Sequence, residues 1–420
     1  MTSSTRLADG RRDGASAHDP PAPGELRLGL ALGVLSALGP VSIDLYLPAF
    51  PRIAHELSST PSEVQRTLSM FFLALACAQI PVGSTGDRFG RKAPLYGGLA
   101  LFVLASLGCA AVGSIGALIV MRFIQGVSVC AGTAVSRAII RDLKTGPEAA
   151  RLMASTFLVI GISPILAPLV GTGLMTVIGW RGLFVVLAAL GLIGLAITRF
   201  ALPESLPAER RVPRGTPLLP AYLALLERGR FLAAAAVAGL ASTVPFAYLT
   251  AAPFVFSGVF GLGSATYSVL LAANAICAIG MMQLSPVLMR RWGARQVLVR
   301  ASTAGVSLVA AAALVAALGP VHVVVFQLFS MLLFAVSGLL LAPAAVTALD
   351  ASGSAAGSAA GMLGTLQLVI TAASSALISL FPAFSLTPLL AVLGGALSLA
   401  TLLSMVSGPA AATAPRGGAA

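Results

Sequence analysis

The chain has 420 residues, of which 57% are hydrophobic and 10% are charged, and its formal net charge is +12. Together with a mean hydropathy of +0.96, this composition excludes an ordinary soluble domain. A basic chain can bind nucleic acid, but the positions of its basic residues, described below, argue against such a partner.

Apolar runs of about 20 residues are long enough to cross the hydrocarbon core of a membrane as helices. The sequence contains twelve such runs, separated by short polar or Gly/Pro-rich stretches, and it therefore predicts an all-α membrane protein. The predicted spans are 26–50, 64–83, 95–113, 116–137, 152–176, 180–200, 230–254, 264–289, 297–317, 320–346, 357–380 and 384–407.

A charged segment at residues 201–229 divides the twelve predicted spans into six and six. The loop DRFGRK at Asp87–Lys92 is echoed by RRWGAR at Arg290–Arg295, in the corresponding loop of the second half, as expected for two parallel repeats. The predicted organisation is a disordered tail at 1–25, a six-helix bundle at 26–200, a cytoplasmic linker at 201–229, a second bundle at 230–407 and a tail at 408–420.

The basic residues are distributed unevenly between the two predicted sides of the membrane. All but four of the 26 lie in the tails or in loops on one side, while Arg52, Arg66 and Arg181 lie near the other side and Arg122 lies within a span. This asymmetry predicts that both termini are cytoplasmic. We expect a multi-pass protein of the bacterial inner membrane whose first apolar run, longer than a signal-peptide core, is retained as a helix.

Asp44 is the only carboxylate well inside a predicted span, and Arg122 is the only arginine in a comparable position. Ionisable groups at membrane depth usually mark an ion or substrate pathway. Arg122 and Gln125 share a helical face, on which Gly126 leaves room. Arg122 lies roughly 9 Å from the outer end of its span at 1.5 Å per residue. Asp44 lies at a similar depth, so the two side chains are placed to meet.

A buried acid beside a cation is a natural proton carrier. Loss of water favours the neutral acid and a nearby guanidinium favours the charged one, so separating and recombining the two would take up and release a proton. The alternative is a static ion pair that holds two helices together. No histidine competes for this role, because His18 and His55 lie in a tail and a loop and His322 lies at a helix end.

The segment GSTGDRFGRK, residues 83–92, joins the second and third spans. Gly83 permits close helix approach and Gly90 a tight turn. Without further context the segment is a basic membrane anchor. Its ionisable residues are Asp87, Arg88, Arg91 and Lys92.

The ordered string G-x-x-G-D-R-x-G-R-K closely resembles the loop motif of the major facilitator superfamily, apart from Thr85 where the family often has Leu. The resemblance implies that Asp87 and Arg88 latch the cytoplasmic side shut against the other half. MRFIQG at residues 121–126 resembles the superfamily's fourth-helix arginine motif, which is tied to proton coupling.

The fifth span contains SPILAPLVGTG at residues 163–173, which resembles the superfamily's antiporter motif and so favours export over uptake. Pro164, Pro168 and Gly171 would bend this helix and let it pack closely. A merely kinked helix is the alternative.

Further segments narrow the resemblance to the Bcr/CflA drug-resistance transporters, which export bicyclomycin, chloramphenicol-type antibiotics and, in some members, other small metabolites. These segments are SIDLYLPAF at 42–50, Ser136–Arg137, Ile140–Asp142, GWRGLF at 179–184, PES at 203–205 and FAYLTAAPFVF at 246–256. The residues expected to line the substrate cavity are Tyr46, Gln125, Phe246, Tyr248 and Asn274. The alternative role for the aromatic residues is packing between helices. The alternative role for Asn274 is a hydrogen bond between helices.

The sequence disfavours other classes of membrane protein. It has no HExxH or GxSxG motif, no GxxxxGK[ST] phosphate loop, no repeated polar ring and no CxxC pair, so an enzyme, an ATP-driven pump, a channel and a metal site are not expected. We expect a proton-coupled multidrug exporter that needs no cofactor beyond the proton gradient. Its partners are a small-molecule drug, protons and membrane lipid, and one chain suffices. The alternative is a proton-linked exporter of an endogenous metabolite, or an importer.

Overall fold

The computed structural model describes residues 23–144, 146–213, 219–352, 356–381 and 386–406. Regular structure within these ranges is entirely helical, which confirms the predicted fold class. The predicted tails at 1–25 and 408–420 lie outside the described residues, except that α1 already begins at Pro23. The long helices are α1 (Pro23–Asp44), α3 (Pro61–Phe89), α4 (Lys92–Ala111), α5 (Ile115–Leu143), α6 (Gly146–Phe200), α8 (Gly229–Phe254), α9 (Ser264–Trp292), α10 (Ala294–Leu318), α11 (Val323–Ala351), α12 (Ala356–Ile378) and α13 (Leu386–Val406).

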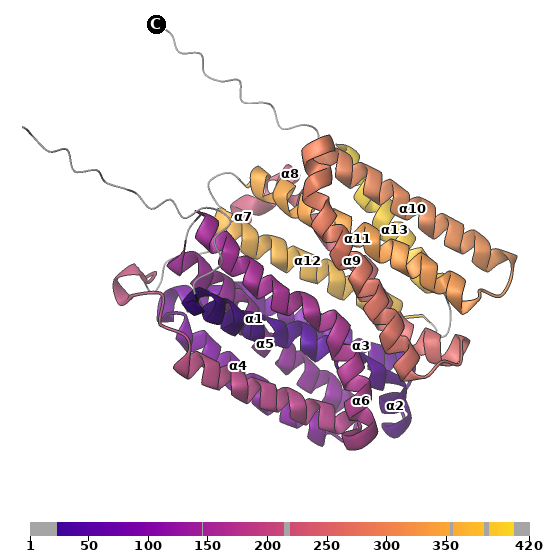
Figure 1. Ribbon diagram of the computed structural model, residues 1–420, viewed down its shortest axis with the longest axis horizontal. Helices are drawn as coiled ribbons and strands as arrows, with labels where there is room; N and C mark the ends of the chain where they lie inside the picture. Colours follow the sequence, from indigo (N-terminus) through magenta and orange to yellow (C-terminus); the bar gives the residue numbers. More distant parts are fainter. Residues whose placement is uncertain (1–22, 145, 214–218, 353–355, 382–385, 407–420) are drawn as a thin grey trace, which may run out of the picture.

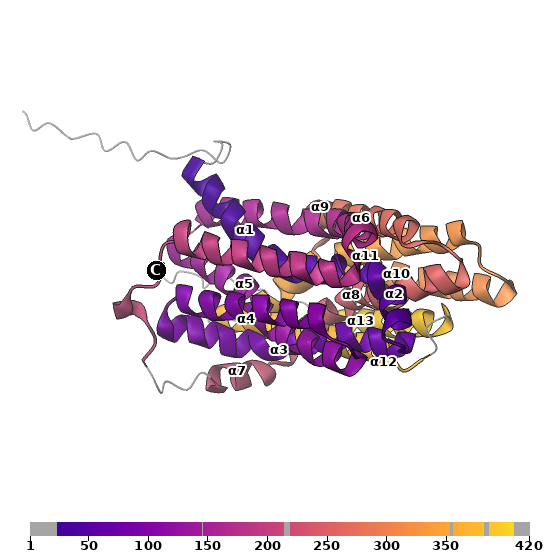
Figure 2. The ribbon, with the colours of Figure 1, turned by 90° about the horizontal axis from the view of Figure 1, so that it is seen from below.

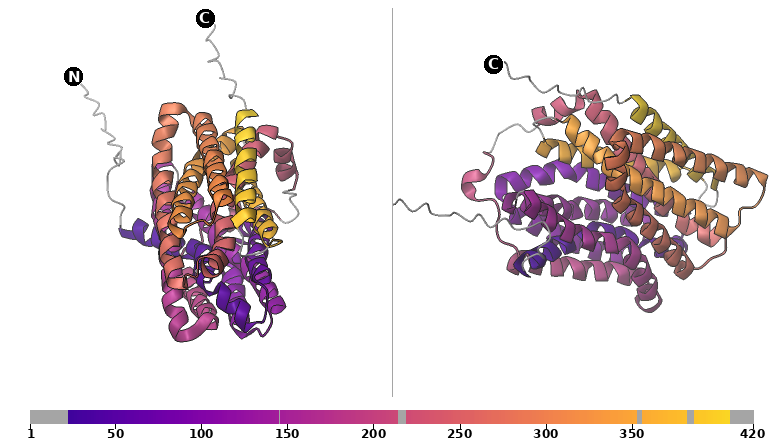
Figure 3. Two further views of the ribbon diagram at one scale, coloured as in Figure 1. Left: turned by 90° about the vertical axis from the view of Figure 1, so that its right-hand side faces the viewer. Right: turned by 45° about the horizontal axis from the view of Figure 1, so that its top comes forward.

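Eleven helices in the described ranges are long and apolar enough to cross a membrane. This number agrees with twelve predicted spans because α6 contains two of them, 152–176 and 180–200. Gly179 divides α6, with φ 65° and ψ 179°, a left-handed conformation that glycine adopts without strain. The chain turns back at this point, and Gly191 and Gly194 in the second part of α6 lie against Phe102 and Leu99 of α4. Figure 3 shows the two bundles from two further directions.

Short elements connect the long helices. After α1 the chain forms η1 (Leu47–Ala49) and α2 (Phe50–Glu56). The regular α-helix therefore ends at Asp44, while the apolar membrane span continues through these two elements, from Glu25 to Glu56. The segment between the two halves contains η2 (Ala208–Arg210) and α7 (Leu219–Leu226), and a π-helical turn, η3 (Val255–Val259), follows α8. Figure 2 shows α7 at the edge of the molecule, outside both groups of helices.

The helices form two bundles, α1 to α6 and α8 to α13, coloured indigo to magenta and orange to yellow in Figure 1. They meet through α3 against α12 and α6 against α9. We call the side of the membrane where α1 begins and α13 ends the termini side, and the other the far side. The two bundles lie close together at the far side and diverge towards the termini side (Figure 1).

Two glycines show that α3 and α12 diverge. Gly83 lies on the same face of α3 as Ser69, and Gly364 lies on the same face of α12 as Ser375, at helical spacing. Ser69 and Ser375 touch at the far side, but a Cβ added at Gly83 or Gly364 would find nothing within 4 Å. Along this pair of helices the bundles are therefore in contact at the far side, whereas the positions of Gly83 and Gly364, nearer the termini side, face open space.

Glycine allows close helix packing within the N-terminal bundle. A Cβ at Gly132 of α5 would collide with the Leu35 carbonyl of α1, and a Cβ at Gly126 would collide with the Phe71 carbonyl of α3. Small residues at such crossings let two backbones come together where lipid provides no hydrophobic driving force. The orientation of α5, and of Arg122 on it, depends on these contacts.

We therefore expect Gly132→Ala to destabilise the protein by about 1–3 kcal/mol through overpacking. Gly116→Ala in the same helix is the matched control, because its Cβ would enter open space. Thermal unfolding in detergent should show a lower transition temperature for Gly132→Ala alone. Equal transition temperatures for the two variants would contradict the close contact between α1 and α5.

Candidate functional site

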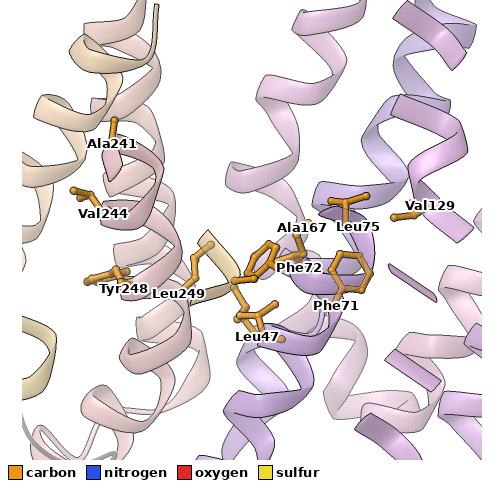
Figure 4. Close-up of a cluster of buried hydrophobic side chains, with 14 of the residues drawn as sticks. Leu47, Phe71, Phe72, Leu75, Val129, Ala167, Ala241, Val244, Tyr248 and Leu249 are labelled. Atoms are coloured by element: carbon orange, nitrogen blue, oxygen red, sulfur yellow. The ribbon is translucent and has the colours of Figure 1, made fainter. Parts of the chain in front are cut away.

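A cavity of about 220 Å³ lies between the two bundles. Helices α1 and α6 form one wall, and α8, α9 and α11 form the other. Its lining is almost entirely apolar, and Asp44 is the only ionisable side chain among the lining residues. Figure 4 shows Leu249, a lining residue of α8, pointing towards Phe72 and Ala167 of the opposite bundle.

Asp44 is the last residue of α1 and shares its cavity-facing side with Pro40 and Ile43. It is only 5% exposed, and no other acidic side chain in the described ranges is buried to this degree. The Ser163 hydroxyl lies beside the carboxyl group, outside the geometry of a well-formed hydrogen bond. The cavity wall therefore carries one carboxyl group in apolar surroundings.

Arg122 is fully buried inside the N-terminal bundle. Its guanidinium lies over the rings of Phe71 and Tyr46, with Cζ 4.3 and 4.7 Å from the ring centroids. Nη1 donates to the Ser42 carbonyl at 3.2 Å and to Gln125 Oε1 at 2.5 Å, while Nε and Nη2 have no hydrogen-bond partner. The positive charge of Arg122 is thus stabilised by cation–π contacts and two oxygen acceptors, and not by a carboxylate.

The structure corrects the expectation that Asp44 and Arg122 face each other. Neither side chain takes part in the ion pairs found among the described residues. Arg122 contacts Ser42 and Tyr46, which flank Asp44, whereas the Asp44 carboxyl lines the cavity. Arg122 reaches the backbone carbonyl of Ser42 and the ring of Tyr46 but not the Asp44 carboxyl, so a similar depth in the membrane did not bring the two charges together.

Only Phe246 of the five predicted cavity residues lines this cavity. Tyr46 is buried in the N-terminal bundle, where Oη lies 2.7 Å from Thr67 Oγ1. Gln125 also lies there and donates from Nε2 to Ser106 Oγ at 2.7 Å. Tyr248 and Asn274 are buried within the C-terminal bundle. These four residues do not line the cavity: Tyr46 and Gln125 bond neighbouring helices of the N-terminal bundle, and Asn274 Oδ1 accepts a hydrogen bond from Gln327 of the C-terminal bundle.

The proline- and glycine-containing motif of α6 lies beside Asp44. Pro164 lines the cavity, and α6 continues as a helix through Pro164 and Pro168. The Pro168 carbonyl accepts a hydrogen bond at 3.1 Å from Ser268 of the other bundle. A Cβ at Gly171 would collide with the Leu45 carbonyl. The motif therefore brings α6 against both the segment after α1 and the start of α9.

Hydroxyl groups join the two bundles at the far side of the cavity. Ser375 Oγ of α12 lies 2.9 Å from Ser69 Oγ of α3 and 2.8 Å from Thr250 Oγ1 of α8. Thr172 Oγ1 of α6 lies 2.8 Å from Ser268 Oγ of α9. Sequence reasoning missed these residues, because serine and threonine are common in membrane helices and carry no pattern that identifies an interface.

We expect Ser375→Ala to favour opening of the far side, because it removes a hydrogen bond between the bundles that is worth about 0.5–1.5 kcal/mol. The population ratio should change roughly 2- to 12-fold. Ser374→Ala is the matched control, since Ser374 bonds Thr243 within one bundle. Spin labels at Arg66 and Leu380, in a cysteine-free background, should report more long distances for Ser375→Ala only. Identical distance distributions would exclude a closing role for Ser375.

The loop between α3 and α4 forms an ion-pair network within the N-terminal half. Arg91 pairs with Asp87 at 2.7 Å and with Asp142 of α5 at 2.6 Å. Among the described residues Asp87 thus forms its ion pair with Arg91 of the same bundle and not with a residue of the other bundle. Gly90 has φ 90°, and a Cβ there would lie 2.8 Å from Glu204 Oε2, so this turn requires glycine.

Glu204 anchors the segment that follows α6 to the start of α4. Its carboxylate accepts hydrogen bonds from the backbone N–H groups of Arg91 and Lys92, at 2.8 and 3.2 Å. Partial loss of water raises the pKa of Glu204, but hydrogen bonds from backbone N–H groups outweigh this effect, so its pKa lies below the ordinary value of 4.5.

A lowered pKa means that the charged carboxylate stabilises the fold above pH 4.5 and that this contribution disappears as the pH falls through the folded-state value. We expect Glu204→Gln to reduce stability at pH 7 by about 0.5–1 kcal/mol, the low end for a capping residue because solvent screens the site. The difference in unfolding temperature from the wild type should shrink below pH 4.5. Glu209→Gln in the same segment is the control, and a pH-independent difference would contradict this account.

Comparisons with known proteins agree with this architecture. A family model described as Major Facilitator Superfamily matches residues 32–375. An uncharacterized MFS-type transporter of Bacillus subtilis, YdgK, is 31% identical over 372 residues, covering 86% of this chain and 91% of that protein. A bicyclomycin resistance protein homolog of Haemophilus influenzae is 31% identical over 60% of this chain and 63% of its own length. The multidrug resistance protein MdtL of Klebsiella pneumoniae is 30% identical over 62% and 66%.

Solved structures share the fold at low sequence identity. A bacterial homolog of the human lysosomal transporter Spinster, in an inward-facing and unoccupied conformation, has a TM-score of 0.67 at 16% identity, covering 92% of this chain and 95% of that one. A D-xylose–proton symporter has a TM-score of 0.65 at 16% identity, covering 91% and 95%. Fold, membrane spans and sequence relatives agree, and the chain belongs to the major facilitator superfamily of membrane transporters.

Proposed function

We propose that the chain is a proton-coupled exporter of small molecules that works by alternating access. The observation that carries the proposal is the position of Asp44, the one ionisable side chain on the wall of the cavity between the bundles. Ionisable groups in such positions mark proton and substrate pathways in transporters, where substrate sites lie between repeats near the middle of the membrane.

The excess of basic residues in loops on the termini side supports a cytoplasmic location for that side. In this orientation the cavity is closed towards the exterior by the Ser69–Ser375 and Thr172–Ser268 contacts. Cargo would then enter from the cytoplasm or the inner leaflet. When the bundles rock, α3 and α12 approach each other at the cytoplasmic side, and the loop with Asp87 and Arg88 would serve there as the latch.

Coupling arises because proton and cargo stabilise different states of the same site. A charged Asp44 needs water, a cation or hydrogen-bond donors around it, whereas a protonated Asp44 is compatible with an apolar, closed cavity. Cargo that enters from the cytoplasm favours release of the proton inward, and protonation from outside favours return. Differential binding of the two ligands to the two orientations is sufficient to link their movements.

Arg122 takes part in this mechanism as a positioning residue. Its contacts with Ser42 and Tyr46 support the segment on both sides of Asp44. A change in the orientation of α1 would alter these contacts and the direction of the Asp44 carboxyl together. The proton gradient is the only energy source required, and a single chain in membrane lipid would provide the pathway.

The names of two relatives support antibiotics as cargo. The Haemophilus influenzae relative is named a bicyclomycin resistance protein homolog, and the Klebsiella pneumoniae relative a multidrug resistance protein. The cavity is apolar and accommodates small hydrophobic groups. We infer that the cargo includes bicyclomycin- and chloramphenicol-type compounds and that the chain confers resistance to them.

Asp44→Asn should abolish proton-driven export while the protein still inserts into the membrane. The amide keeps the shape of the side chain but cannot carry a proton. Everted vesicles prepared from cells that express the variant should not accumulate chloramphenicol in response to a proton gradient. They should also not release protons when chloramphenicol is added. Asp350→Asn, at an exposed position of α11, is the control that should behave as wild type. Undiminished chloramphenicol-induced proton release by Asp44→Asn would remove the basis of the proposal.

A further inference from the structure

Three uncharged polar side chains are buried in the C-terminal bundle, next to the cavity but outside its lining. They are Tyr248 of α8, Asn274 of α9 and Gln327 of α11, with exposed fractions of 2%, 0% and 7%. Gln327 Nε2 donates to Asn274 Oδ1 at 2.8 Å and to the Leu270 carbonyl at 3.1 Å. The Tyr248 hydroxyl lies close to Asn274 and to Ser330. We call Tyr248, Asn274 and Gln327 the polar cluster.

Each member of the polar cluster has a polar atom without a hydrogen-bond partner in the described structure. These atoms are Tyr248 Oη, Asn274 Nδ2 and Gln327 Oε1. A buried polar atom left unpaired costs about 1–3 kcal/mol, and a purely structural network would be expected to pair its own members. The three atoms together offer donors and acceptors without a charge, which matches an amide or a hydroxyl group.

The ring of Phe334 links one member of the polar cluster, Tyr248, to the cavity. Phe334 of α11 lines the cavity together with Leu271 and Ala275 of α9. Its ring also packs edge-on against the ring of Tyr248, with centroids 5.2 Å apart and an interplanar angle of 82°. Asn274 lies between Leu271 and Ala275 in the sequence. A rotation of the Phe334 side chain would therefore expose Tyr248 to the cavity.

The direction of Tyr248 agrees with this arrangement. In Figure 4 its side chain points away from the N-terminal bundle, while that of the next residue, Leu249, points towards it. Gln327 lies seven residues before Phe334, two turns along the same face of α11. The polar cluster thus lies within the C-terminal bundle.

We propose that the polar cluster is a second binding subsite, which takes the amide or hydroxyl group of an uncharged substrate whose apolar part occupies the cavity. The inference rests on the proposed function, since it names a substrate class for the same cavity. An uncharged substrate needs hydrogen-bond partners that the apolar cavity wall does not provide. A lipophilic cation needs only the Asp44 carboxylate and the apolar wall.

The test compares equilibrium binding of radiolabelled chloramphenicol, a neutral amide with hydroxyl groups, and tetraphenylphosphonium, a lipophilic cation, to the purified full chain in lipid nanodiscs. Gln327→Leu should raise the Kd for chloramphenicol roughly tenfold, equivalent to about 1.4 kcal/mol. Its Kd for tetraphenylphosphonium should change less than about twofold. Gln367→Leu is the matched control, because Gln367 of the same bundle bonds Ser242 and lies outside the polar cluster.

Tyr248→Phe separates a binding role from a structural role and keeps the test informative if Gln327→Leu folds poorly. Because Tyr248 Oη has no partner, its removal should leave the unfolding temperature of the unliganded protein unchanged or higher, yet weaken chloramphenicol binding severalfold. A lower unfolding temperature with unchanged binding would overturn the inference. Equal loss for both ligands, or no chloramphenicol binding by the wild type, would also overturn it.

The outcome is independent of the test of export. Selective loss of chloramphenicol binding in protein that releases no protons on chloramphenicol addition would support the subsite and reject the proposed coupling. Proton-coupled export that is insensitive to Gln327→Leu and Tyr248→Phe would support the coupling and reject the subsite.

Discussion

The buried guanidinium of Arg122 determines how the N-terminal wall of the cavity is built. A charge at membrane depth must be stabilised by its surroundings, and here the rings of Tyr46 and Phe71 and the Ser42 carbonyl provide that stabilisation. Ser42 and Tyr46 flank Asp44, so the contacts that hold the cation also hold the end of α1. The Asp44 carboxyl is left pointing away from the cation and into the cavity.

This separation changes what neutralises Asp44. An Asp–Arg pair would satisfy itself, and proton or cargo would have to compete with a permanent counter-ion. With Arg122 held by aromatic rings and amide and carbonyl oxygens, Asp44 has the Ser163 hydroxyl beside it and forms no ion pair among the described residues. A proton or a cargo molecule can then neutralise or solvate the Asp44 carboxylate, which the protein itself does not do. The two ligands therefore compete for the same carboxylate.

The architecture could be read from the sequence because span length and the charge of the loops are one-dimensional signals. The site could not, because membrane helices are apolar on every face and no periodicity shows which face lines a cavity. The sequence positions of Asp44 and Arg122 gave their depth in the membrane, but they did not give the direction in which each side chain points from its helix. For the same reason Gln125 and Asn274 were assigned to the cavity, and the contact of Ser69 with Ser375 gave no signal in the sequence.

The weakness of the far-side contacts explains how one carboxyl group can control two bundles. Hydrogen bonds between membrane helices average about 0.6 kcal/mol, and an aromatic pair such as Phe72–Phe246 adds about 0.5–1.5 kcal/mol. The hydroxyl hydrogen bonds and this aromatic pair therefore contribute only a few kcal/mol together. Reversing a two-state population from 1:99 to 99:1 requires about 5.5 kcal/mol, whereas burying an unpaired ion costs several kcal/mol. A change in the charge of Asp44, beside the α6–α9 contact, is thus large enough to decide which side is open.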